Sequence, residues 1–187
     1  MRRAKNNAGK INFKIVNNMI FARPLTKKDM PFFSKWTTYY YNHQTDPLCC
    51  LFLSNSNIKV LDTMDKRKHW YKEYKEPTEE EGDIYVWYII YEWNMKTDLV
   101  HKIGAVNFSG DIEECETLFF LIPKFKGREL MVDGYREAEE NLFEKYKVKY
   151  IWGEAENKGS ANVFKENWFD KLEHLNDYYK YTENYYL

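Results

Sequence analysis

Residues 84–122 constrain the fold of this chain more than any other segment, because they describe three consecutive strands. Ile84 to Trp93 is rich in β-branched and aromatic residues, residues 99–109 repeat that character, and Cys115 to Ile122 does so again. A short polar turn separates each pair. Strands joined by turns of this length pair in antiparallel order, so the segment predicts a β-meander.

Apolar periodicity and turn signals on both sides of the meander predict the remaining elements. In chain order these are a strand at 19–25, a helix capped by Thr26 and Asp29, a helix from Thr63, an amphipathic helix over 130–147, a strand at 150–155, a helix over 158–167 and one or two strands within 171–181. The expected fold class is therefore mixed α+β. It has a central, mostly antiparallel, twisted sheet of about six or seven strands flanked by about four helices.

The length and charge of the chain limit its function classes. A chain of 187 residues fits one domain, expected at 19–187, with residues 1–18 as a partly flexible N-terminal arm. The 28 Lys and Arg against 29 Asp and Glu leave no excess positive charge, which argues against a nucleic-acid partner.

Targeting and metal signals are absent from the sequence. The longest apolar run, Ile84 to Tyr91, is too short to cross a bilayer, and the polar N-terminus lacks the apolar core of a signal peptide. We therefore expect no membrane partner and a cytoplasmic protein. The three cysteines and four histidines lack the spacing of metal ligands, so we expect no metal site.

The segment from Pro123 to Glu129, called the basic turn below, joins the third strand of the meander to the helix that follows. A glycine at such a turn lets backbone N–H groups face outward, and the helix adds the positive end of its dipole. Lys124, Lys126 and Arg128 place three cations there. The turn is consistent with a phosphate site and equally with a solvated connection.

Four short motifs occur in the order in which the GNAT acetyltransferase superfamily carries them. They are R-P-L-T-K-K-D at 23–29, a glutamate seven residues before a proline (Glu116 and Pro123), the basic turn in place of the acetyl-CoA loop Arg/Gln-x-x-Gly-x-Gly/Ala, and N-K-G-S-A-N-V from Asn157 followed by Trp168-Phe169. The last motif is typical of the branch that acetylates protein N-termini and related amines. The chain resembles this superfamily between residues 19 and 181, and its element order matches the superfamily's plan.

The resemblance implies an N-acetyltransferase that uses acetyl-CoA and transfers the acetyl group by direct attack of a primary amine in a ternary complex. Implied cofactor-binding groups are the backbones of Phe120, Leu121 and Ile122, the backbone N–H groups of Lys126, Gly127, Arg128, Glu129 and Leu130, and the side chains of Asn157 and Ser160. Implied catalytic residues are Glu116, as a general base acting through a water molecule, and Ser160, as a donor to the CoA sulfur. Both have a structural alternative: Glu116 as a solvent-facing carboxylate on a strand, and Ser160 as a helix cap.

The acceptor is described only by class, as a small-molecule amine or an amine of a protein or peptide. Trp36 and Tyr40 are candidate acceptor-binding residues, since they lie near the end of the first helix, where the superfamily lines its acceptor groove. Packing into the core is the alternative role for this aromatic group. The tyrosine-rich C-terminus fits either an acceptor wall or a dimer interface, so the chain is expected to be a monomer or a homodimer.

Two departures from the superfamily pattern support a second hypothesis. Glu129 stands where the acetyl-CoA loop has its second glycine, and Phe164 stands where many members carry the tyrosine that protonates the leaving thiolate. The alternative function is therefore a non-catalytic protein of the same fold that binds a partner, with or without CoA.

Overall fold

The computed structural model describes residues 18–42, 63–75, 83–155, 157–167, 169, 171–175 and 178–184. Its strands are β1 (Asn18–Pro24), β2 (Ile84–Asn94), β3 (Leu99–Gly110), β4 (Cys115–Leu121), β5 (Tyr150–Ala155), β6 (Lys171–Leu175) and β7 (Tyr178–Asn184). Its helices are α1 (Met30–Asn42), α2 (Met64–Lys75), α3 (Leu130–Tyr146) and α4 (Lys158–Glu166). A short 3₁₀ turn at Lys27–Asp29 leads into α1. A second 3₁₀ turn, at Pro123–Phe125, forms the first part of the basic turn.

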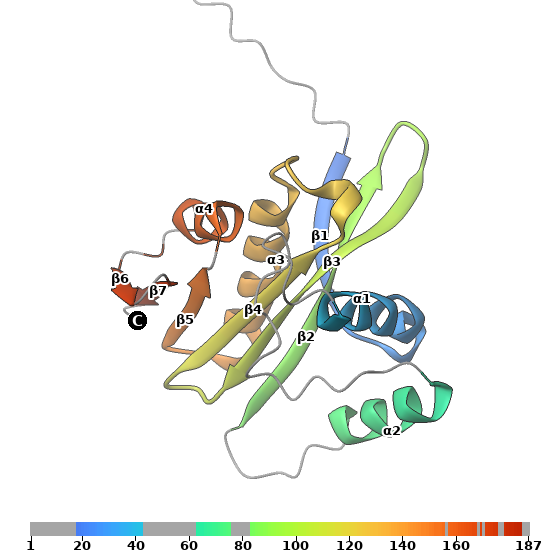
Figure 1. Cartoon of the computed structure of the whole chain (residues 1–187), viewed down its shortest axis with the longest axis horizontal. Coiled ribbons are helices and arrows are strands. Elements are labelled where there is room, and N and C mark those ends of the chain that lie inside the picture. The colour runs from blue at the N-terminus through green and yellow to red at the C-terminus, as the bar shows by residue number, and fades with distance from the viewer. Residues whose placement is uncertain are drawn as a thin grey trace, which may run out of the picture.

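The described strands form one seven-stranded sheet in the order β1-β2-β3-β4-β5-β7-β6 (Figure 1). The meander β2-β3-β4 is antiparallel throughout, and β5 pairs with β4 in parallel. The mixed α+β class with a mostly antiparallel sheet is therefore confirmed. The division into an arm and a domain stays a prediction, because residues 1–17 lie outside the described residues.

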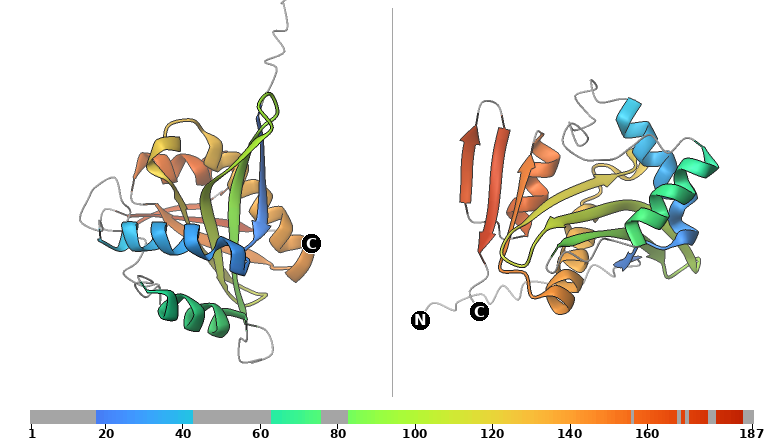
Figure 2. Two further views of the ribbon diagram at one scale, coloured as in Figure 1. Left: turned by 90° about the vertical axis from the view of Figure 1, so that its right-hand side faces the viewer. Right: turned by 90° about the horizontal axis from the view of Figure 1, so that it is seen from below.

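Helices cover both faces of the sheet, because β2 alternates large apolar residues toward each face. Trp87 meets Phe33 of α1 with ring centroids 4.8 Å apart, whereas Tyr88 lies on the other face with Phe108 and the α3 residue Tyr135. Figure 2 shows α1 and α2 on one side of the sheet and α3 on the other. Within the described ranges, no helix combines the length and apolar character that a membrane crossing requires.

The sheet forks between β4 and β5. These strands pair only at Cys115 with Ile151 and at Glu116 with Trp152. Beyond that point β4 runs on along β3, whereas β5 continues along β7 through Ala155. The fork leaves the last residues of β4 without a neighbouring strand on one side among the described residues, and it positions the site described below.

Thr26 and Asp29, which were predicted to cap the first helix, form a capping box. The backbone N–H and the hydroxyl of Thr26 both donate to Asp29, at 2.9 and 2.6 Å. Asp29 also accepts from Tyr91 at 2.9 Å and forms an ion pair with Lys102 at 2.7 Å. Burial of Asp29 alone would raise its pKa, but the bonds from Lys102, Thr26 and Tyr91 outweigh burial and hold the pKa below its ordinary value.

This arrangement predicts acid sensitivity. A carboxylate whose folded-state pKa is lowered stabilises the fold above its unfolded pKa of 3.8, and this contribution is lost as pH falls through the folded pKa. Asp29→Asn should cost about 2 kcal/mol at pH 7. Its deficit relative to the wild type should shrink as pH falls below 4, measured by denaturant unfolding at each pH. The exposed-site variant Asp65→Asn is the control, and a pH-independent deficit for Asp29→Asn would contradict the prediction.

Candidate functional site

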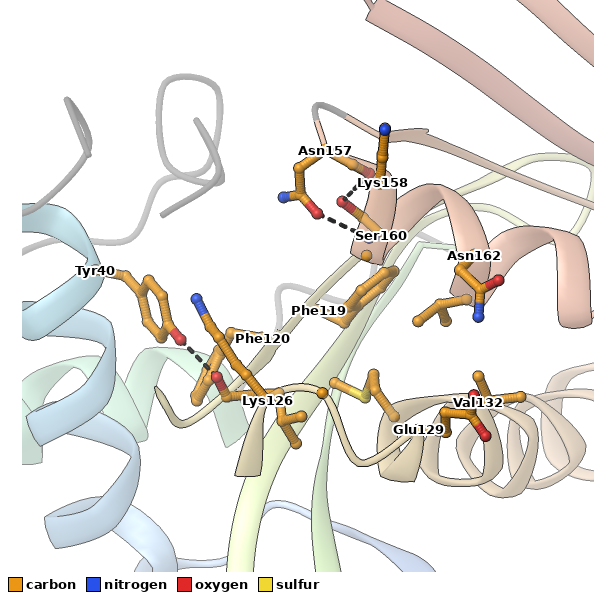
Figure 3. A pocket seen from close by; sticks show the side chains of 15 residues that line it. Tyr40, Phe119, Phe120, Lys126, Glu129, Val132, Asn157, Lys158, Ser160 and Asn162 are labelled. Carbon is orange, nitrogen blue, oxygen red and sulfur yellow. Dashed lines mark hydrogen bonds between the residues drawn. The ribbon is translucent and has the colours of Figure 1, made fainter. Parts of the chain in front are cut away.

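A cavity of about 570 Å³ lies at the fork, between the end of β4, the basic turn, the first turns of α3 and α4, and Tyr40 of α1. Figure 3 shows its lining side chains. Of the residues selected from the sequence, the lining includes Tyr40, Phe120, Leu121, Lys126, Gly127, Glu129, Asn157 and Ser160. Segments far apart in the sequence therefore meet around one cavity.

The backbone of β4 presents an extended edge to this cavity. The N–H of Ile122 donates to the carbonyl of Ile103 on β3 at 2.8 Å. Because antiparallel residues alternate between facing the partner strand and facing away, Leu121 and Phe119 direct their backbone groups to the opposite edge. The Leu121 carbonyl accepts a bond from the Tyr40 hydroxyl there, at 2.6 Å (Figure 3).

This geometry revises the strand residues predicted to pair with a cofactor. The prediction named the backbones of Phe120, Leu121 and Ile122, but the Ile122 N–H is already bonded to β3 and Phe120 shares its orientation. Leu121 remains, and Phe119, which the sequence did not single out, joins it. The sequence predicts that backbone groups along β4 point alternately toward β3 and away from it. Which residues point away can be decided only from the register between β3 and β4.

The basic turn changes direction through two left-handed residues. Gly127 has φ 74° and Glu129 has φ 58°, and α3 begins at Leu130. Within the described part of the turn, the Lys126 N–H donates to Pro123 and the Val132 N–H donates to Glu129, both at 3.1 Å. The N–H groups of the first turn of α3 have no acceptor inside the helix. With the positive end of the helix dipole, they make this turn able to bind an anion.

The three basic side chains of the turn separate in the structure. Lys126 lines the cavity, with its Nζ 5.7 Å from the ring centroid of Tyr40. Lys124 is exposed, and its Nζ lies 4.6 Å from the ring centroid of Phe125. The Arg128 guanidinium forms an ion pair with Glu92 on β2 instead of lining the cavity. Whether these three cations serve one phosphate group stays a prediction, and Lys158 of α4, which the sequence did not select, also lines the cavity.

Asn157 and Ser160 lie together at the start of α4, where Asn157 is the N-cap. The Asn157 side chain caps α4 by accepting from the Ser160 N–H at 2.9 Å, and the Ser160 hydroxyl donates to the Asn157 carbonyl at 3.3 Å. Ser160 is 7% exposed and lines the cavity. Phe164 is buried one helical turn further on, 5.4 Å from Phe119 between ring centroids, so an apolar ring fills the place where a tyrosine was expected.

The remaining selected residues lie outside the cavity lining. Trp36 packs edge-on against Tyr39 with ring centroids 5.4 Å apart, which is the packing alternative. The guanidinium of Arg128 pairs with β2, and the side chains of Ile122 and Leu130 do not line the cavity.

Glu116 forms the last pair with β5 before the fork. It is half-buried and shares a face of β4 with Phe120, about 13 Å away along the strand. Across the sheet its register neighbours are Ser109 on β3, then Tyr85 on β2, and Trp152 on the other side. These four residues form a row on the face that α1 covers further along, and Glu116 is not among the residues that line the cavity.

Comparisons with known proteins agree with the fold. No family model and no curated protein matches the chain. Among solved structures, spermidine N-acetyltransferase from Vibrio cholerae in complex with CoA and spermine superposes with a TM-score of 0.65 at 14% identity, covering 88% of this chain and 95% of that one. Ribosomal-protein-S5-alanine acetyltransferase from Vibrio fischeri gives 0.61 at 12% identity, covering 92% and 95%.

A third structure, the N-acetyltransferase PseH from Campylobacter jejuni in complex with acetyl coenzyme A, gives a TM-score of 0.56 at 14% identity, covering 89% of this chain and 99% of that one. These likenesses show the fold, which this chain shares with several solved N-acetyltransferases. The chain has the GNAT N-acetyltransferase fold.

Proposed function

We propose that this protein is an acetyl-CoA-dependent N-acetyltransferase acting on a primary amine. The observation that carries the proposal is the continuity of the cavity. The extended edge of Leu121 and Phe119 leads directly to the N–H groups of the basic turn at the start of α3. A cosubstrate with an amide-rich arm attached to a pyrophosphate matches an extended edge followed by an anion site.

Different residues of the cavity bind the pyrophosphate and the amide-rich arm of the cosubstrate. The backbone N–H groups of the basic turn and the first turn of α3, with the Lys126 ammonium, hold the pyrophosphate. Leu121 and Phe119 pair with the arm as a neighbouring strand would, and one of their N–H groups polarises the thioester carbonyl. The Asn157 side chain holds an amide of the arm.

The chemical step needs a neutral amine and a stabilised leaving thiolate. Acetyl-CoA supplies an activated thioester. Glu116 accepts the proton of the attacking amine through a water molecule, the new C–N bond forms as the C–S bond breaks, and the Ser160 hydroxyl donates toward the sulfur. Ser160 takes this role because Phe164 has no proton to give.

For the acceptor, we propose an amine that approaches along the row Tyr85, Ser109, Glu116 and Trp152. Tyr85 is 41% exposed, which leaves part of this row open to solvent. Two of the structurally similar proteins are named for spermidine and for a ribosomal protein. We therefore propose as acceptor either a small-molecule amine or an amine of a protein or peptide. The cytoplasm and a monomer or homodimer stay the expected compartment and assembly.

Titration calorimetry with CoA, followed by turnover of acetyl-CoA on a panel of polyamines and peptide N-termini, tests the proposal. Binding together with turnover is the expected result. No heat at saturating CoA would overturn it. CoA binding without turnover of any amine would favour the second candidate function, a non-catalytic protein of this fold. The apolar ring of Phe164 and the carboxylate of Glu129 are the observations that support this candidate.

Glu129 supplies a prediction about affinity. Its left-handed backbone costs about 1 kcal/mol in a residue with a side chain, whereas a carboxylate at a helix N-terminus contributes about 0.3–1 kcal/mol. Glu129→Gly should therefore leave stability nearly unchanged. Because the carboxylate lines the proposed pyrophosphate site, the variant should bind CoA about fivefold tighter by calorimetry. Glu129→Gln, which removes only the charge, should reproduce the gain, and weaker binding by both would contradict it.

A further inference from the structure

Arg128 and Glu92 connect the basic turn to β2, which lies two strands away from β4 in the sheet. Arg128 Nη2 lies 2.5 Å from Glu92 Oε1, and Nη1 donates to Oε2 at 3.4 Å, so the contact is two-pronged. The side chain of Glu92 is only 5% exposed, whereas that of Arg128 is 43% exposed. A carboxylate buried to this extent requires a cationic partner, because an unpaired charge there is strongly destabilising.

Two further contacts fix the geometry of this ion pair. The Asn18 side chain of β1 donates to Glu92 Oε1 at 2.7 Å, which anchors the carboxylate to the sheet edge. The Arg128 guanidinium also lies 5.4 Å from the ring centroid of Phe125, a buried residue of the same turn. Arg128 is therefore held on two sides, by β2 and by the turn's own ring.

The position of Arg128 between the two left-handed residues gives this contact its effect. Gly127 and Glu129 flank it, at φ 74° and 58°. A glycine adopts this conformation freely, but a residue with a side chain, such as Glu129, keeps it only where the surroundings fix it. The ion pair with Glu92 holds the side chain of Arg128, and so restricts the backbone of Arg128 between Gly127 and Glu129. The direction in which the backbone N–H groups of these residues point is thereby fixed.

We infer that Glu92 and Arg128 act as positioning residues that hold the basic turn in its anion-binding conformation, and that the Arg128 guanidinium is not a phosphate ligand. The inference rests on the proposed function for its ligand, since it names what shapes the CoA site. Glu92 lies on β2, 36 residues from the turn, and carries no motif of its own.

The variants Glu92→Gln and Arg128→Ala separate the two roles of the arginine. If both residues position the turn, each variant should weaken CoA binding about tenfold, and the double variant should be no weaker than either single one. If Arg128 bound phosphate directly, Glu92→Gln would free it and leave affinity unchanged or higher. That result would overturn the inference.

Hydrogen exchange of the backbone amides of Lys126 and Val132 tests the same inference without any ligand. These two N–H groups donate to the carbonyl oxygens of Pro123 and Glu129, which belong to the basic turn. Protection should be lost in both variants, and unchanged protection in both would overturn the inference. If the wild type fails to bind CoA, the proposed function fails, but the exchange result still decides the role of this pair.

Arg136→Ala is a matched control. The Arg136 side chain is also 43% exposed, but its partner Asp133 is 61% exposed and 3.5 Å away. The control should keep both CoA affinity and the exchange protection of the turn. Arg128→Ala should lower the Tm by about 5 °C or more, and Arg136→Ala by less than about 2 °C.

Discussion

Replacing Gly104 with alanine is expected to be among the most destabilising single changes in this protein. A Cβ at this position would lie 2.2 Å from the carbonyl oxygen of Phe120 and 3.3 Å from the Cα of Leu121. Both atoms belong to the backbone of β4, so no side chain can rotate to make room. The strands must move apart, at a cost of about 3 kcal/mol, the upper end of the range for overpacking.

The loss should appear as a fall in Tm of roughly 6–12 °C for a chain of this size, measured by calorimetry. Because Phe120 and Leu121 border the cavity, CoA affinity should fall as well. Gly159→Ala is the control: its Cβ would meet only the side chain of Asn157, at 3.1 Å, and the residue lies in a helix, where alanine is favoured. Equal Tm values for both variants would contradict this prediction.

Glu116→Gln is expected to have the largest effect on turnover. If Glu116 takes the proton of the amine, an amide at this position leaves the shape of the strand unchanged but cannot act as a base. The kcat should fall about 100-fold while the KM for acetyl-CoA stays within about twofold. Steady-state kinetics with the best acceptor from the panel measures both.

Glu113→Gln is the matched control for this experiment. Glu113 lies in the connection that precedes β4, is 63% exposed and pairs with Lys149 at 2.6 Å, so it offers the same chemical change outside the row that contains Glu116. Its kcat should match the wild type. An unchanged kcat in Glu116→Gln would remove Glu116 from the role of base and leave it as a strand carboxylate.

Most of the fold was predictable because it follows from local signals. The alternation in 84–122 placed the meander, and Thr26 and Asp29 marked the start of the first helix, where the structure has a capping box. The apolar stripe at 130–147 corresponds to α3 within one residue. Each of these signals lies within a few residues of the element that it defines.

The parts of the site that depend on tertiary partners were not predictable in the same way. Arg128 was grouped with the lysines of its turn because its partner, Glu92, is distant in sequence and marked by no motif. Which residues of β4 turn their backbone groups toward the cavity depends on the hydrogen bond from the Ile122 N–H to the Ile103 carbonyl. Only the register between the strands shows this bond and so identifies Leu121 and Phe119. Trp36 and Tyr40 looked equivalent in sequence, yet only Tyr40 reaches the cavity.

The fork between β4 and β5 also bears on how the protein behaves at high concentration. A sheet ordinarily exposes unpaired strands only at its two margins, but here β4 offers one in the middle of the sheet as well. Exposed strand edges invite pairing with another chain and so favour aggregation. A molecule lying along Leu121 and Phe119 would close that edge, so we expect CoA to suppress self-association during purification and refolding.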